Sequence, residues 1–105
     1  MRQPNHKTLD FEAINAAALP ALPSILPRWL PDGKRRGAEW VARNPTRADR
    51  RAGSFSVNIR TGKWADFATG DRGGDVTSLA AYLFGLRQVD AARRIAEMLG
   101  MEVAS

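Results

Sequence analysis

The sequence predicts an α+β domain in which a small antiparallel sheet lies between short N-terminal helices and two C-terminal helices. Two patterns carry this prediction. The centre of the chain alternates apolar and polar residues with the period of a strand, and both flanks repeat apolar residues with the period of a helix. Residues 1–9 show neither pattern and are expected to form a flexible tail. Because the chain has 105 residues, residues 10–105 are expected to form one domain.

The N-terminal flank predicts two short helices. Asp10 is a suitable N-cap for an apolar stripe within residues 11–18. Pro20 should end that helix, because proline disfavours helical geometry in the residue before it. A second helix is expected over residues 22–30. The Pro-Asp-Gly sequence at residues 31–33 is typical of a turn and leads into a basic cluster.

The centre of the chain predicts the strands of the sheet. Residues 38–43 alternate and suit a short strand. Residues 54–60 alternate more clearly, with an apolar residue at every odd position. Thr61 and Gly62 form a tight turn, so we expect a hairpin whose second strand begins near Trp64.

The C-terminal flank predicts a glycine-rich turn followed by two helices. The turn spans residues 69–74, and Asp75 is expected to cap a helix that ends at Gly85. A phosphate is not expected at the N-terminus of this helix, because the Asp75 carboxylate would repel it. The last helix is expected over residues 89–99, with Gly100 ending it.

Positive charge is concentrated in the middle of the chain. The whole protein has a net charge of +5, whereas residues 34–63 contain nine basic and two acidic residues. A polyanion such as nucleic acid would be attracted to this segment, and a solvated basic surface is the alternative. The excess of arginine over lysine favours bidentate phosphate contacts. The nine residues are Lys34, Arg35, Arg36, Arg43, Arg47, Arg50, Arg51, Arg60 and Lys63.

The residue types exclude several classes of site. There is no cysteine, and the one histidine, His6, lies in the predicted tail. Neither a disulfide nor a zinc site is therefore expected, and no metal or cofactor is assigned. The apolar stretch at residues 16–30 is interrupted by three prolines, lacks the layout of a secretory signal and is too short to cross a membrane. We expect a cytoplasmic protein with no membrane partner.

Three motifs together resemble the zinc-binding domain of bacterial, phage and plasmid DNA primases and primase-helicases. They are Gly-Ser-Phe-Ser-Val at residues 53–57, Trp-x-x-Phe at residues 64–67, and Gly-Gly-Asp at residues 73–75 ahead of a helix. The resemblance covers residues 42–99. It implies a zinc-ribbon-like sheet, here in a cysteine-free version that has lost the zinc ligands.

The positions that would hold zinc in that family are occupied here by Asn44, Arg47, Asp66 and Thr69. A structural metal contributes much of the folding energy of a small domain, so something else should tie these two loops together. We expect a charge-assisted pair between Arg47 and Asp66, with Asn44 and Thr69 hydrogen-bonded to nearby backbone. The alternative is that all four are ordinary turn residues.

The resemblance implies that the chain binds single-stranded template DNA, while any polymerising activity lies in another domain. The nine basic residues would follow the phosphate backbone, and Trp64 or Trp40 would stack on a base. The alternative for Trp64 is a place in the hydrophobic core. Phe55 and Phe67 are also expected in the core.

Enzymatic activity is not expected. Asp66, Asp71 and Asp75 are the only clustered carboxylates, and each has a structural explanation as a tie, a turn or a cap. The expected partners are single-stranded DNA or another nucleic acid, together with a primase or helicase catalytic domain. A second hypothesis is a stand-alone phage or plasmid protein that binds and modulates a host protein complex, for example an anti-CRISPR inhibitor.

Overall fold

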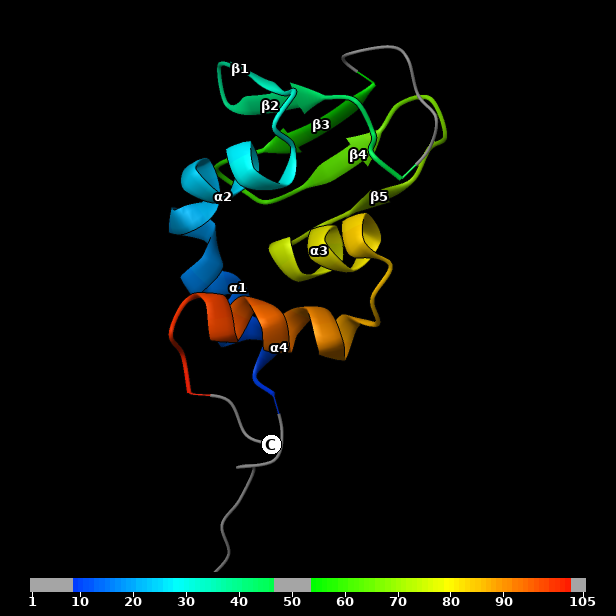
Figure 1. Ribbon diagram of the computed structural model, residues 1–105. Coiled ribbons are helices and arrows are strands. Elements are labelled where there is room, and N and C mark those ends of the chain that lie inside the picture. Colours follow the sequence, from blue (N-terminus) through cyan, green and yellow to red (C-terminus); the bar gives the residue numbers. More distant parts are fainter. Residues whose placement is uncertain (1–8, 47–53, 103–105) are drawn as a thin grey trace, which may run out of the picture.

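A computed structural model describes residues 9–46 and 54–102, and the predicted tail therefore lies almost entirely outside the described residues. Figure 1 shows a sheet as the upper layer, helices α3 and α4 beneath it, and helices α1 and α2 along one side. The α+β class is confirmed. The elements in chain order are α1 (Phe11–Ala18), the 3₁₀ helix η1 (Leu19–Ala21), α2 (Leu22–Trp29), β1 (Lys34–Arg36), β2 (Glu39–Ala42), β3 (Phe55–Asn58), β4 (Trp64–Asp66), β5 (Arg72–Gly73), α3 (Val76–Phe84) and α4 (Gln88–Met98).

The N-terminal helices follow the prediction. Asp10 caps α1, since its carboxylate accepts a hydrogen bond of 3.0 Å from the Ala13 backbone N–H. The helix ends before Pro20, which is instead the second residue of the short 3₁₀ helix that leads directly into α2. Proline is tolerated there because the first turn of a helix does not use its backbone N–H groups. None of the helices in the described ranges is long and apolar enough to cross a membrane.

Each of the five strands pairs antiparallel with the next in the chain, in the order β1-β2-β3-β4-β5. The expected hairpin is confirmed as β3 and β4, with Gly62 at a φ of 80° in the connection. The two outer strands were not predicted. β1 was expected only as a basic cluster and β5 only as part of a turn, because neither has an alternating pattern of its own. Each is defined by its pairing with a neighbour.

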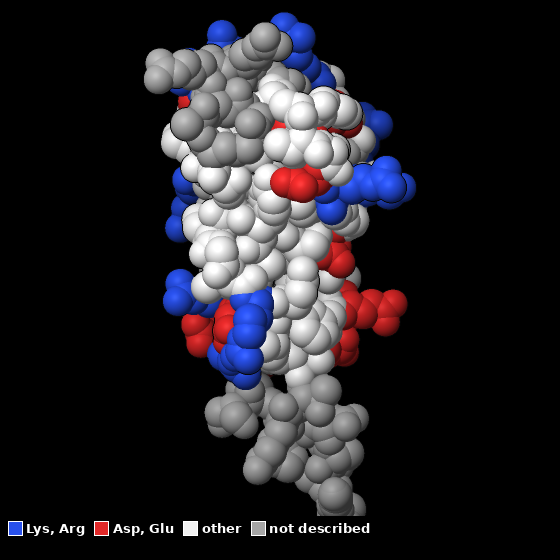
Figure 2. Space-filling model, turned by 90° about the vertical axis from the view of Figure 1, so that its right-hand side faces the viewer, with Lys and Arg blue, Asp and Glu red and all other residues white. Residues whose placement is uncertain are grey.

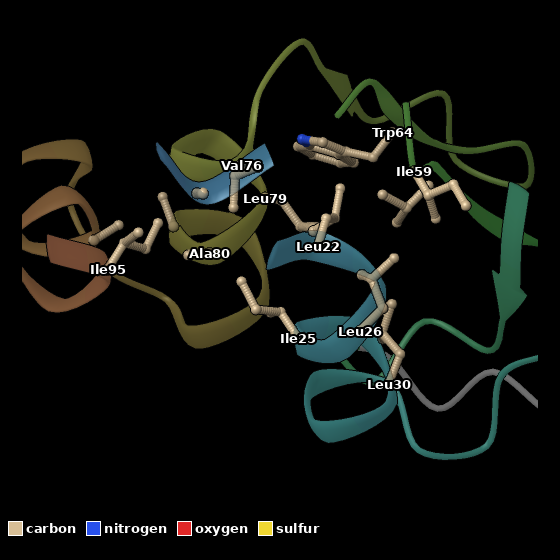
Figure 3. Close-up of a cluster of buried hydrophobic side chains, with 14 of the residues drawn as sticks. Leu22, Ile25, Leu26, Leu30, Ile59, Trp64, Val76, Leu79, Ala80 and Ile95 are labelled. Carbon is tan, nitrogen blue, oxygen red and sulfur yellow. The ribbon is translucent and has the colours of Figure 1, made fainter. Parts of the chain in front are cut away.

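The hydrophobic core lies between the sheet and the helices. Figure 3 shows Leu22 and Leu26 of α2 facing Ile59 and Trp64, with Leu79 of α3 beside them. All five side chains are at least nine-tenths buried. The N-terminal helices therefore supply a large part of the apolar surface that covers the inner face of the sheet, as is needed in a small domain without disulfides.

The C-terminal helices begin and end as predicted, within a residue. Asp75 accepts a hydrogen bond of 2.8 Å from the Ser78 backbone N–H, and the Ser78 hydroxyl reaches back to the Asp75 backbone in a capping box. Gly85 ends α3 in the left-handed conformation, with a φ of 65°. The interpretation of Asp75 as a helix cap is confirmed. This cap fixes the position at which the chain leaves the sheet and enters α3.

Candidate nucleic-acid interface

The strand register divides the sheet into two faces. Residues directly opposite each other on neighbouring strands point to the same side, so the row Trp40, Val57 and Trp64 belongs to the inner face, against the helices. The other side carries the residues one position away. We call it the open face, and it is formed by Lys34, Arg36, Glu39, Val41, Ser56, Asn58, Lys63, Ala65, Phe67 and Arg72.

A shallow groove of about 380 Å³ lies on the open face. Glu39, Ser56 and Asn58 form its polar part, while Lys63 and Phe67 also line it. The Phe67 side chain is 74% exposed, the largest exposed fraction of any large hydrophobic residue that the structure describes. The groove therefore combines a free aromatic ring, a cation and fixed polar groups.

The prediction that Phe67 belongs to the core is wrong. Trp64 points toward the helices, and the side chains of a strand alternate between faces, so a residue three positions later must point the other way. The backbone keeps this alternation beyond β4, because the Phe67 N–H donates to the Ser54 carbonyl at 2.8 Å. Phe55, by contrast, is fully buried as expected.

The assignment of Trp64 to base stacking is also wrong. Its side chain is only 5% exposed, and its ring packs against Phe55 and Tyr82 with centroid distances of 5.7 and 4.7 Å. Its indole N–H donates to the Ser78 hydroxyl at 3.0 Å. A ring held in this way offers no free face to a base. Trp40 is half-buried, and its indole N–H donates to the Leu30 carbonyl.

The basic residues within the described ranges do not gather on one side of the molecule. Lys34, Arg36 and Lys63 lie on the open face, but Arg35 belongs to the opposite side of β1. Figure 2 shows Lys and Arg side chains on several sides of the outline, both at the upper end, where the sheet lies, and lower down over the helices.

The remaining basic residues have other positions. Arg43 pairs with Asp32 at 3.8 Å, and Arg60 follows β3 in the exposed connection to β4. Arg47, Arg50 and Arg51 lie outside the described residues. Arg72 was missed. It stands opposite Ala65 and so joins the open face, and only the pairing of β5 with β4 reveals this.

The only carboxylate of the open face, Glu39, is held in place by its neighbours. It accepts hydrogen bonds from the Ser56 hydroxyl at 2.6 Å and from the Asn58 amide at 2.8 Å. Asn58 is itself oriented, because its oxygen accepts from the backbone N–H groups of Arg60 and Thr61. The acidic group in the groove is therefore preorganised.

A second polar cluster contains Asn44 and Asp66, two of the four residues that were expected to take the place of a metal. Asn44 and Asp66 are both buried and are joined by a hydrogen bond of 2.6 Å. The Asn44 amide also donates to the Tyr82 hydroxyl, which in turn donates to Asp71, both at 2.8 Å. Tyr82 was not predicted as a member, since it lies on α3, far away in the sequence.

Backbone contacts complete this cluster. The Thr46 N–H donates to the Asn44 oxygen and the Ala68 N–H donates to Asp66, both at 2.8 Å. Thr69 is exposed, and its hydroxyl accepts from the Asp71 N–H at 3.2 Å. The expected partner of Asp66, Arg47, lies outside the described residues, so that pairing stays a prediction. The cluster connects two loops and α3 through side-chain hydrogen bonds.

We predict that chelation of metal ions leaves the stability of the protein unchanged. Asn44 and Asp66 already hydrogen-bond to each other, and Asp66 also accepts from a backbone N–H. The Asn44 amide and the Thr69 hydroxyl are poor zinc ligands. Thermal unfolding followed by circular dichroism, with and without EDTA, should give the same midpoint. A lower midpoint with EDTA, restored by added zinc, would contradict the prediction.

Within residues 9–46 and 54–102, no group of three or more His, Cys, Asp or Glu side chains could hold a metal ion. No protein-family model matches the chain, and no curated protein has a matching sequence.

Proposed function

We propose that the chain binds single-stranded nucleic acid through the open face of its sheet. The exposed Phe67 ring carries this proposal, because it lies on a groove that it shares with Lys63. Exposed aromatic rings on sheet surfaces stack on unpaired bases, and neighbouring cations bind the phosphate backbone. A double helix keeps its bases stacked inside and has no base face to offer to such a ring.

The charges of the open face support a phosphate-bearing ligand. Lys34 and Arg36 stand on the edge strand β1, and Arg72 stands on β5 at the opposite edge of the sheet. Lys63 lies between them, beside the groove. Together with Glu39 these residues give the open face an excess of positive charge, which attracts a polyanion along the whole width of the sheet.

The motifs at residues 53–57, 64–67 and 73–75 support a more specific role for this binding activity. We propose that the chain is a non-catalytic module of the kind that accompanies primase or primase-helicase catalytic domains, and that it holds the template strand for them. The cluster around Asn44 and Asp66 would then replace the metal of the zinc-binding versions.

We predict that Phe67→Ala weakens binding to single-stranded DNA about tenfold, which corresponds to about 1.4 kcal/mol for the loss of one stacked base. Fluorescence anisotropy with labelled oligo(dT) at low salt measures the dissociation constant. Phe84→Ala is the matched control, because Phe84 is also an exposed phenylalanine but lies on α3, where it contacts Trp29 edge to face.

Salt dependence tests the phosphate contacts in the same experiment. Lys63→Gln should reduce the slope of log Kd against log salt concentration by about 0.7, the value for one phosphate contact on a single strand. Arg94→Gln on α4, away from the sheet, should leave the slope unchanged. Equal affinities of the Phe67→Ala and Phe84→Ala variants, or an unchanged slope for Lys63→Gln, would refute the proposed interface.

A second candidate function is binding to a protein partner through the helical side. An apolar groove of about 180 Å³ lies there, lined in part by Trp29, Phe84, Leu86 and Met98. Phe84 and Met98 are partly exposed, and such a surface suits an apolar partner, for example a host protein complex. Absence of oligonucleotide binding at low salt would favour this candidate over the first.

A further inference from the structure

We propose that the groove on the open face reads the base it binds, and that it selects bases with an exocyclic amine, such as cytosine, over thymine or uracil. This inference rests on the proposed function and names the ligand of the same site. It depends on Glu39, because binding of the phosphate backbone alone does not require a carboxylate in the groove.

Glu39 has acceptor capacity left over. A carboxylate has two oxygens with about four acceptor positions, and the Ser56 hydroxyl and the Asn58 amide each use one, on different oxygens. The remaining positions belong to a half-buried side chain that lines the groove. A carboxylate accepts hydrogen bonds and donates none, so it complements an amine group and repels a carbonyl oxygen.

The acceptor is fixed before any ligand arrives. Asn58 cannot turn its amide away from Glu39 without losing two hydrogen bonds, at 2.9 Å from the Arg60 N–H and at 3.1 Å from the Thr61 N–H. Ser56 is buried and donates to the other carboxylate oxygen. A polar group that is oriented in advance discriminates between ligands because no ordering is needed on binding.

The surroundings of Glu39 fit a single nucleotide. Phe67 offers its ring for stacking, and Lys63 is available for the phosphate. The groove volume of about 380 Å³ falls within the range of small-ligand sites, roughly 300–1,000 Å³. Cytosine and thymine are similar in size and differ at ring position 4, where cytosine carries the N4 amine and thymine carries the O4 carbonyl oxygen.

Anisotropy titrations with labelled oligo(dC) and oligo(dT) at neutral pH test the inference on the unmodified protein. We expect oligo(dC) to bind about tenfold more tightly than oligo(dT). Glu39→Gln should abolish this preference, because its amide can also donate a hydrogen bond to the thymine O4. Glu97→Gln on α4 removes the same charge far from the groove and should keep the preference.

The outcomes separate the two proposals. A preference for oligo(dC) that Glu39→Gln removes and Glu97→Gln retains supports base reading. Equal binding of both oligonucleotides by the unmodified protein, or a preference that survives Glu39→Gln, overturns base reading and leaves the proposed function standing. Absence of binding to both oligonucleotides at low salt overturns the proposed function itself.

Discussion

Asp66→Ala should lower the free energy of unfolding by about 3 kcal/mol, because hydrogen bonds to a buried carboxylate are lost and their donors stay behind. Asp66 is fully buried, and the donors left without it include the Asn44 amide and the Ala68 backbone N–H. Urea unfolding followed by tryptophan fluorescence measures the change, since Trp64 packs beside this cluster against Tyr82.

Asp32→Ala provides the matched control. Asp32 is an exposed aspartate whose ion pair with Arg43, at 3.8 Å, is open to solvent. Its loss should change the free energy of unfolding by about 0.5 kcal/mol, as is usual for exposed ion pairs. If the Asp66→Ala variant were as stable as the Asp32→Ala variant, the buried cluster would not contribute to the folding energy in the way that we propose.

This cluster also shows which contacts can be predicted from the sequence and which cannot. The motif indicated that Asn44 and Asp66 lie close together, because it aligned them with positions that share one metal ion. Their bond to each other and the participation of Tyr82 could not be predicted in this way. Tyr82 reaches Asn44 only because α3 packs across the inner face of the sheet, which no local pattern expresses.

The strands show the same division between local and tertiary information. The alternation in residues 54–60 was sufficient to predict β3 and its hairpin with β4. β1 consists of three exposed basic residues, so its sequence has no alternation and its existence depends on pairing with β2. The edge of the sheet, and with it the position of Arg72, could therefore be known only from the assembled fold.

The error at Phe67 had a different origin, because the necessary information was in the sequence. Phe67 was expected in the core, and the core was the alternative position for Trp64, although an odd separation along a strand puts two side chains on opposite faces. With the more buried Trp64 on the inner face, alternation assigns Phe67 to the outer one. Once Trp64 is assigned to the inner face, the residues of the open face follow by alternation. Phe67 then takes the place of Trp64 as the proposed stacking residue.

Gly73→Ala should destabilise the protein by about 3 kcal/mol, at the upper end of the range for overpacking, while its neighbour Gly74 tolerates the same change. A Cβ atom at Gly73 would overlap the indole nitrogen of Trp64 and would lie 2.5 Å from the Ser78 hydroxyl oxygen. Neither group can retreat easily, because Trp64 packs on Phe55 and Ser78 is part of the cap of α3.

Gly74 offers a control one residue away, since a Cβ atom there would meet nothing within 4 Å. Gly74→Ala should change the free energy of unfolding by no more than about 0.5 kcal/mol.

A Trp64→Phe background tests the reason for glycine at position 73. The smaller ring leaves space beside Gly73, so the cost of Gly73→Ala should fall. Urea unfolding of the unmodified protein, the two single variants and the double variant measures this coupling. An equal cost in both backgrounds would show that contact with the indole is not the reason for glycine at this position. A lower cost would mean that Gly73 is needed for close packing against Trp64, while Asp75, two residues later, caps α3.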